Sequence, residues 1–230
     1  MGSRPAPARS GGAATTVTVA VVRQRELHQV RHLLTAPDLL AVRGRLGAAT
    51  ARALLHELAP GQVTATCRRC GGPHGQPVVA GACVSASYAG GLVAVAVCGR
   101  PVGVDLELAS ATAFPGFPDV ALGPAEPDGD RARSWTRKEA ILKATGDGLT
   151  VDPRAVGVAG GVVRWAAAPG PIALADLVVP DGFAGAVAVL TDRPLEVVAV
   201  DGDALLPAPT PVDGDARLPA PTPMDGDAGG

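Results

Sequence analysis

The chain has 230 residues, 47% of them hydrophobic, and its 20 basic and 22 acidic side chains give a formal net charge of −2. That length can bury a sizeable core. The sequence has no run of about 18 consecutive apolar residues, so it predicts no membrane span. Its N-terminus has no basic segment followed by an unbroken apolar stretch, so it predicts no signal peptide. Four cysteines without a secretory signal do not indicate a disulfide scaffold, so we expect a cytoplasmic globular protein.

Hydrophobic periodicity predicts strands and helices in alternation. Residues 16–22 are β-branched and predict a strand, residues 37–58 have apolar side chains at helical spacing, and the Gly/Pro-rich residues 66–77 predict a loop. The clearest helix is 135–145, which Gly146 ends. Further strands are predicted at 78–87, 92–97, 102–108, 155–165, 185–190 and 195–200. This mixture indicates an α+β fold.

The two ends of the chain have a different composition. Residues 201–212 and 213–224 are near-copies, and a third copy begins at Asp225. Each full copy has three Pro and few large apolar side chains, too little to offset the entropy of ordering it. We therefore expect a disordered repeat tail at 207–230 and a flexible N-terminus at 1–14. Removing the last thirty residues should leave the melting temperature nearly unchanged, unless Leu205 and Leu206 dock on the body.

Residues 102–108 read V-G-V-D-L-E-L. On a strand, Asp105 and Glu107 lie on one face, about 7 Å apart along the chain. Gly103 shares that face and is expected to leave room for a ligand. Carboxylate oxygens at this spacing suit a hard divalent ion such as Mg²⁺. For the D-x-E pattern alone, a solvated acidic face is the commoner interpretation.

The helix at 135–145 reads W-T-R-K-E-A-I-L-K-A-T. Glu139 and Lys143 are four residues apart and share one helix face, an arrangement that is common on protein surfaces and worth about 0.3 kcal/mol there. The chain contains only two lysines, Lys138 and Lys143, and both lie in this helix. In a chain whose other cations are Arg, this indicates a need for a compact ammonium group.

Together, G-V-D-L-E and W-T-R-K-E-A-I-L-K-A-T-G-D-G-L resemble the Sfp-type 4′-phosphopantetheinyl transferase family. Upstream, C-R-R-C-G-G-P-H-G-Q-P-V-V and V-S-A-S-Y-A-G-G-L are similar to the family's Gly-x-Pro and Ser-His-Ser stretches. The resemblance covers residues 39–205. It implies two similar α+β halves, 15–100 and 101–206, related by a pseudo-twofold axis, with the active site in the cleft between them.

The resemblance also implies a function. Such an enzyme transfers the 4′-phosphopantetheine arm of coenzyme A to a serine of an apo acyl or peptidyl carrier protein. The reaction depends on Mg²⁺ and releases adenosine 3′,5′-bisphosphate. The implied setting is secondary metabolite biosynthesis by a monomer. Because no basic patch is interleaved with aromatic residues, we expect no nucleic-acid partner.

The resemblance assigns roles to particular residues. It implies that Asp105, Glu107 and Glu139 hold Mg²⁺. Glu139 is the candidate to accept the serine proton, directly or through water, and Lys143 would neutralise phosphate charge. The residues implied for coenzyme A are Arg43, Arg52, Gly75, Gln76, Pro77, Ser85, Ser87, Asp105 and Lys143.

Two positions depart from the family pattern. Ala86 stands where the family places His between two serines, and Gln76 stands where it favours Lys or Arg. The loss of a hydrogen bond to a charged group is worth about 1.5–3 kcal/mol, so we expect a weaker or more specialised enzyme. The alternative is a catalytically impaired homologue that binds carrier protein or coenzyme A without efficient transfer. A third possibility is another Mg²⁺-dependent phosphotransferase.

Cys67 and Cys70, with His74 and Cys83, also raise the possibility of a zinc site. Their spacing fits no familiar zinc knuckle, so reduced thiols in a turn are the favoured interpretation.

Overall fold

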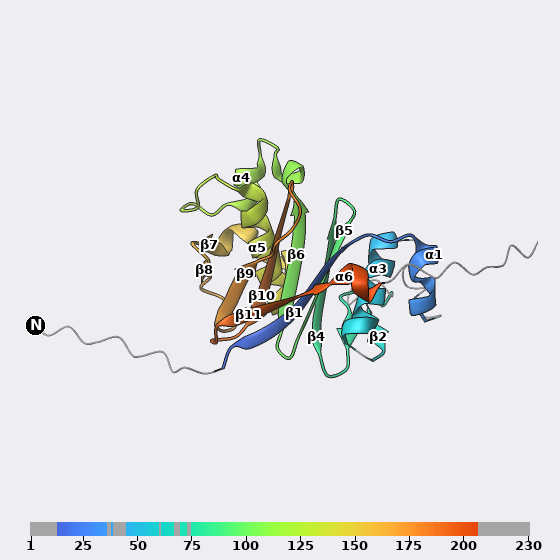
Figure 1. The fold of residues 1–230 in the computed structure, drawn as a ribbon. Helices are drawn as coiled ribbons and strands as arrows, with labels where there is room; N and C mark the ends of the chain where they lie inside the picture. The colour runs from blue at the N-terminus through green and yellow to red at the C-terminus, as the bar shows by residue number, and fades with distance from the viewer. Residues whose placement is uncertain are drawn as a thin grey trace, which may run out of the picture.

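The computed structural model describes residues 13–35, 38, 45–59, 61–66, 70–72 and 75–206. Two sheets carry the fold (Figure 1). The first has the order β11 (Leu195–Asp201), β1 (Thr15–Arg23), β5 (Leu92–Cys98) and β4 (Cys83–Ala89). The second has the order β6 (Val102–Leu108), β10 (Phe183–Leu190) and β9 (Ile172–Asp176). With the helices described below, the predicted α+β class is confirmed.

The two sheets share one apolar core, which we call the inter-sheet core. Val17 and Val19 of β1 pack there with Val104 of β6 and Val187 of β10, and each of these side chains is at most 3% exposed. Because side chains alternate along a strand, the neighbouring residues point to the opposite face of each sheet. Those opposite faces are covered by helices.

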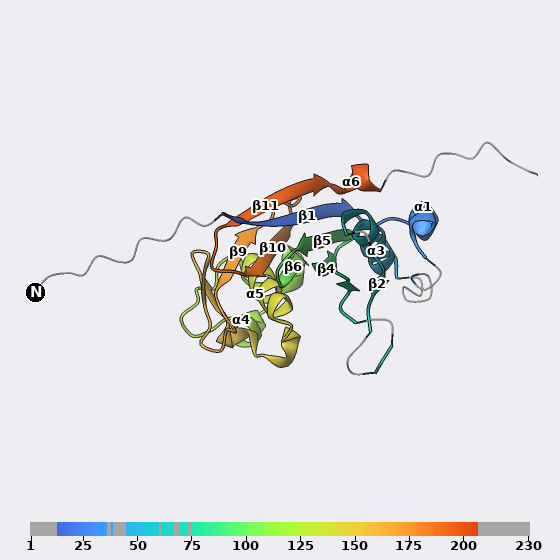
Figure 2. The same cartoon turned by 90° about the horizontal axis from the view of Figure 1, so that it is seen from below.

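Helix α3 (Leu46–Leu58) packs on the first sheet and α5 (Arg131–Thr145) on the second. The two helices lie toward opposite ends of the molecule (Figures 1 and 2). α5 begins four residues earlier than predicted, because the Asp130 side chain caps its N-terminus by accepting a hydrogen bond from the Arg133 backbone N–H. It ends as predicted at Gly146, which has φ +80°.

Two predicted strands are in fact broken by turns. The predicted strand 78–87 is divided into β3 (Val78–Val79) and β4. The predicted strand 155–165 is a hairpin of β7 (Gly157–Ala159) and β8 (Val162–Arg164). Glycines with positive φ stand at both breaks, Gly81 at +79° and Gly160 and Gly161 at +57° and +79°. Only glycine adopts that backbone region readily, so these residues reverse the chain.

The predicted helix 37–58 corresponds to α3, and the elements not yet named are short. That helix is confirmed from residue 46 onward, and the residues before it lie largely outside the described ones. The short elements are α1 (Leu27–Val30), η1 (Arg31–Leu33), β2 (Val63–Thr64), η2 (Ala109–Thr112), α4 (Phe117–Ala121), η3 (Gly148–Thr150), η4 (Pro153–Ala155) and α6 (Gly202–Leu205). None of the helices within the described ranges is long and apolar enough to cross a membrane.

The end of the described chain returns to the first sheet. β11 pairs in parallel with β1, so a strand from the C-terminal part of the sequence completes a sheet that the N-terminal part begins. α6 follows, and Leu206 is 2% exposed in the core beneath α3. The first copy of the repeat therefore starts inside the fold. The predicted disordered tail at 207–230 lies outside the described residues.

Candidate functional site

Two serine hydroxyls join the sheets where β4 lies beside β6. Ser85 Oγ accepts a hydrogen bond from the Val104 backbone N–H at 3.1 Å, and Ser87 Oγ accepts one from the Leu106 backbone N–H at 3.2 Å. Ser87 Oγ also donates to Asp105 Oδ1 at 2.8 Å. Both serines were expected to contact coenzyme A. In the structure their hydroxyls bind β6 and Ser87 orients Asp105, and the contact with coenzyme A stays a prediction.

Helix α5 crosses β6 directly over Gly103. A Cβ atom on Gly103 would lie 2.0 Å from the Ala140 carbonyl oxygen and 2.5 Å from the Ala144 backbone nitrogen. The expectation that Gly103 leaves room for a ligand is therefore wrong, because the helix backbone fills that space. The close approach brings Lys143 Nζ to 2.7 Å from Asp105 Oδ1.

Glu139 lies one turn before Lys143 on α5. Its Oε1 atom is buried and has no hydrogen-bond partner among the residues that the structure describes. Burial raises the pKa of Glu139, and repulsion from Asp105 and Glu107 raises it further, while Lys143 opposes the rise. These four side chains form one electrostatically coupled group, which we call the acidic site.

Glu107 is the outermost member of the acidic site. It is partly exposed, and its Oε1 accepts a hydrogen bond from the Leu108 backbone N–H at 2.9 Å. Within the described ranges, no group of three or more His, Cys, Asp or Glu side chains is arranged to hold a metal ion. The donor chemistry fits Mg²⁺, because the carboxylates repel one another and Glu139 Oε1 has no hydrogen-bond partner in the described part of the chain. The predicted metal site thus remains a prediction.

A cavity lies between α3 and β4, and it gathers several of the residues implied for coenzyme A. Arg52, Gly75 and Pro77 line it, whereas Gln76 between the last two is exposed and Arg43 lies outside the described residues. The further lining residues are Arg45, Ala48, Ala51, Leu55, Ala65, Ala86 and Tyr88. We call this the arginine cavity.

Arg52 is held in the wall of the arginine cavity by a buried carboxylate. Its Nη1 donates to Asp38 Oδ1 at 3.0 Å and to the Val63 carbonyl oxygen at 3.4 Å. Asp38 Oδ2 pairs with His56 Nε2 at 2.9 Å and accepts from the Thr35 backbone N–H at 2.9 Å. Burial alone would raise the pKa of Asp38, but the hydrogen bonds from Thr35 and His56 lower it. Sequence analysis missed Asp38, because nothing local links it to Arg52, fourteen residues away.

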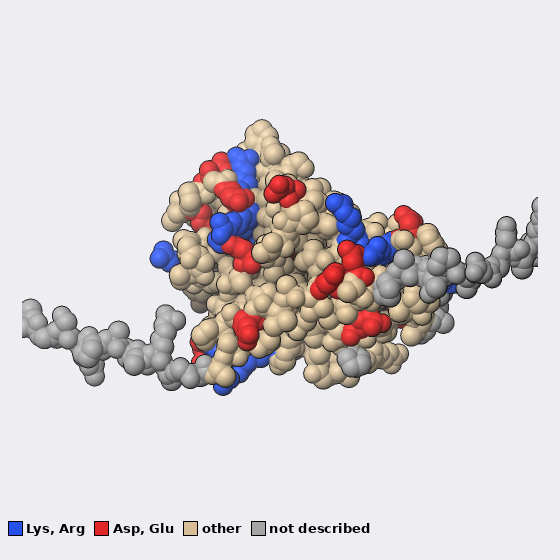
Figure 3. Space-filling model, viewed as in Figure 1, with Lys and Arg blue, Asp and Glu red and all other residues tan. Residues whose placement is uncertain are grey.

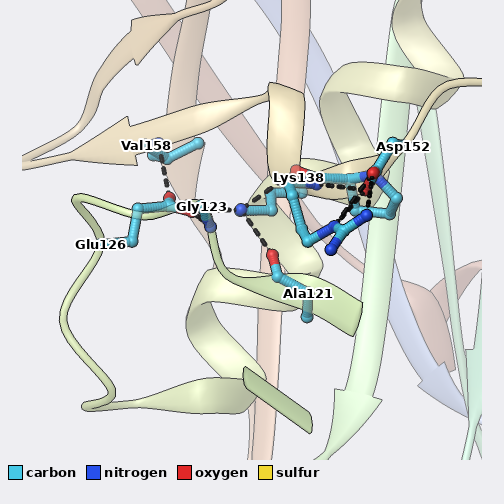
Figure 4. A network of polar contacts seen from close by, with 8 residues as sticks. Ala121, Gly123, Glu126, Lys138, Asp152 and Val158 are labelled. Carbon is cyan, nitrogen blue, oxygen red and sulfur yellow. Dashed lines mark hydrogen bonds and ion pairs between the residues drawn. The ribbon is translucent and has the colours of Figure 1, made fainter. Parts of the chain in front are cut away.

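The two lysines of α5 have different roles. Lys138 is fully buried, and its ammonium group donates to the Ala121 carbonyl oxygen at 2.6 Å and to the Pro153 carbonyl oxygen at 3.1 Å (Figure 4). It also pairs with Glu126, whose carboxylate accepts a hydrogen bond from the Val158 backbone N–H at 2.9 Å. Lys138 thus joins the end of α4, the start of η4 and the segment around Glu126, and Lys143 alone belongs to the acidic site.

Acidic and basic side chains are interspersed on the face shown in Figure 3. On α5, Arg133 and Arg137 both pair with Asp176, and together they lower the pKa of that carboxyl to about 2. The positive charges of Arg133 and Arg137 are therefore partly balanced by Asp176.

No protein-family model matches the chain, and no curated protein is significantly similar to it. The resemblance to the Sfp-type family therefore stays a prediction from the sequence motifs. Of the residues considered for zinc, Cys67 and His74 lie outside the described ones, and Cys70 is exposed.

Proposed function

We propose that this protein is a Mg²⁺-dependent 4′-phosphopantetheinyl transferase that acts on apo acyl or peptidyl carrier proteins. The observation that carries the proposal is the packing of α5 over Gly103. It unites the two motifs, about thirty residues apart, by pairing Lys143 with Asp105 and coupling both to Glu139. The D-x-E strand motif and the Glu–Lys helix motif are each common alone. Their spacing along the chain does not by itself bring them together in one site.

The charges of the acidic site suit the chemistry of phosphoryl transfer. In this reaction the carrier serine oxygen forms a bond to the β-phosphorus of coenzyme A, and the bond from that phosphorus to the departing adenosine 3′,5′-bisphosphate oxygen breaks. In this proposal Glu139 accepts the serine proton, because its raised pKa makes it a stronger base than an exposed carboxylate. The Lys143 ammonium offsets charge on the phosphates.

Magnesium would be held by Asp105, Glu107 and Glu139. When bound, it supplies positive charge that neutralises the pyrophosphate oxygens. Ser87 fixes Asp105 by its hydrogen bond, so one ligand is oriented before the ion and the coenzyme arrive.

The arginine cavity is the proposed seat of the adenosine part of coenzyme A. Arg45 and Arg52 line the cavity as donors for the 3′-phosphate, with the charge of Arg52 already paired with Asp38, and the backbone at Gly75 and Pro77 offers edges for the base. Ala86 in its wall is the chain neighbour of Ser87, which binds Asp105. The cavity and the acidic site therefore flank the same strand. In this proposal the two pseudo-symmetric halves are residues 15–100 and 101–206, and β11 of the second half pairs with β1 of the first.

The impaired homologue remains the second candidate because of one observation. Ala86 lines the arginine cavity and offers no hydrogen-bond donor, while the hydroxyls of Ser85 and Ser87 are engaged with β6. An Ala86→His variant separates the candidates. A large gain in transfer rate supports an enzyme with a weakened grip on coenzyme A, and carrier binding without turnover in both proteins supports the impaired homologue.

The transferase proposal is tested with a panel of apo carrier proteins, coenzyme A and Mg²⁺, followed by intact-mass spectrometry of each carrier. We expect wild-type protein to add phosphopantetheine to at least one carrier. Glu139→Ala should abolish the addition and keep the fold, whereas Glu57→Ala, which changes an exposed glutamate on α3, should not affect it. No mass gain on any carrier contradicts transfer. Failure to bind coenzyme A in calorimetry would instead favour another phosphotransferase.

A further inference from the structure

Two cysteines face each other across neighbouring strands at the open end of the β4–β5 hairpin. Cys83 begins β4 and Cys98 ends β5, and the antiparallel register pairs them directly. Opposed residues in antiparallel strands have Cα atoms about 4.5 or 5.5 Å apart, depending on the type of pair. Disulfides span Cα separations of about 4.4–6.8 Å. Both types of pair thus fall within the range that a disulfide requires.

The two side chains also share one face of the sheet. Cys83 and Cys98 both pack against the inter-sheet core, whereas their neighbours Val84 and Val97 pack on the opposite face beneath α3. Cys83 is partly exposed, so a small oxidant can reach it, and Cys98 is buried behind it. Burial raises the pKa of the Cys83 thiol, and the nearby Cys98 raises it further.

We propose that Cys83 and Cys98 are a thiol modification site, where a peroxide-class oxidant forms a cross-strand disulfide. The Cys83 thiolate attacks one peroxide oxygen, the O–O bond breaks, and after protonation a sulfenic acid and one water result. The Cys98 sulfur then attacks the Cys83 sulfur, the S–O bond breaks, and the departing hydroxide takes the Cys98 proton as a second water. Both sulfurs are oxidised and the peroxide is reduced.

The disulfide would link β4, the edge strand of the first sheet, to β5, and β4 is the strand that makes the hydrogen bonds to β6. Ser85 and Ser87, two and four residues after Cys83, make the hydrogen bonds to β6. The disulfide would close a loop from Cys83 to Cys98, which restricts the unfolded chain. We therefore expect oxidation to raise the melting temperature by about 5 to 10 °C. This inference is independent of the proposed transferase activity.

The test uses the full chain with Cys67→Ser and Cys70→Ser, so that only the proposed pair can react. The protein is treated with hydrogen peroxide, freed of oxidant, unfolded and alkylated without reductant, and its intact mass is measured. We expect two alkyl groups before oxidation, none after it, and two again once dithiothreitol is added. The same protein carrying Cys98→Ala should form no intramolecular disulfide.

Oxidation should be faster at pH 9 than at pH 7, because more of the Cys83 thiol is ionised. The melting temperature of the oxidised protein should fall back when reductant is added. Two free thiols after peroxide treatment, disulfides only between chains, or cross-linking only in urea would each overturn the proposal.

Discussion

Gly103 has no side chain at the point where the backbone of α5 passes over β6. The small residues Ala186 and Ala188 of β10 lie in the same apolar cluster as α5, so the helix can approach the whole second sheet closely. Residue size thus sets the position of Glu139 and Lys143 relative to Asp105. The acidic site depends on a residue that carries no chemistry itself.

Gly103→Ala should destabilise the protein by about 3 kcal/mol or more, because the new Cβ would collide with helix backbone rather than with a movable side chain. Urea unfolding measures the loss. Gly99→Ala is the matched control, since a Cβ there meets no atom within 4 Å. Equal stability of the two variants would contradict the close packing of α5.

Glu139 should make stability depend on pH. Its pKa is raised on folding, so the folded protein disfavours the ionised form, and stability falls as pH rises above the unfolded value of about 4.3. Glu139→Gln removes this loss. In the presence of a chelator, the variant should melt higher than wild type at pH 7, and the difference should vanish near pH 4.

The matched control is Glu57→Gln, which replaces an exposed glutamate on α3. If Mg²⁺ binds at the acidic site, it should raise the melting temperature of the wild type more than that of Glu139→Gln. A variant that melts below the wild type at pH 7 would show that ionised Glu139 is stabilised in the fold.

At the scale of elements, α5 performs two tasks on different faces. Lys143 is directed toward β6, whereas Lys138 is directed toward the end of α4 at Ala121, the start of η4 at Pro153 and the carboxylate of Glu126. The buried ammonium is a common donor for these three short segments of the chain. The helix therefore orders its surroundings as well as the acidic site.

Lys138→Met should destabilise the protein by about 3–5 kcal/mol, because it leaves the Glu126 carboxylate buried without a cation. Adding Glu126→Gln removes that unpaired charge, so the double variant should regain much of the loss. Urea unfolding of the single and double variants forms the required comparison. A double variant no more stable than Lys138→Met would show that the charge of Glu126 is not the cause.

At the scale of the whole molecule, the end of the described chain stabilises the first sheet. Asp201 caps α6 by accepting hydrogen bonds from the backbone N–H groups of Asp203 and Ala204, at 2.9 and 3.3 Å. Gly202 packs closely against Val22 of β1, and Leu206 is buried under α3. Leu205 and Leu206 therefore dock on the body, which was the exception to the expectation that residues from 201 onward are dispensable.

A chain that ends at residue 200 should melt about 6–12 °C lower than the full chain, from the loss of a buried leucine and a helix cap. A chain that ends at residue 206 should melt at nearly the same temperature as the full chain. Differential scanning calorimetry of the three proteins provides the comparison. Equal melting of the shortest chain would show that α6 and Leu206 contribute nothing.

The sequence alone determined the features that depend on neighbours along the chain. Residues 102–108 form the predicted strand, and the helix before Gly146 ends where predicted, because side-chain alternation and glycine capping are local effects. The same local spacing was enough to place Glu139 and Lys143 on one helix face. The sequence pattern did not predict the two chain reversals at Gly81 and at Gly160 and Gly161, because a sequence does not show which of its glycines adopt a positive φ.

Only the tertiary structure decided what occupies the space above Gly103, which lysine is buried, and where the serine hydroxyls of β4 bind. It also joined Asp38 to Arg52, and the first copy of the repeat to the core. Each of these contacts joins segments that are separated along the chain. Such contacts form where packing brings the segments together, and that is fixed by the shape and burial of the whole fold rather than by any local pattern.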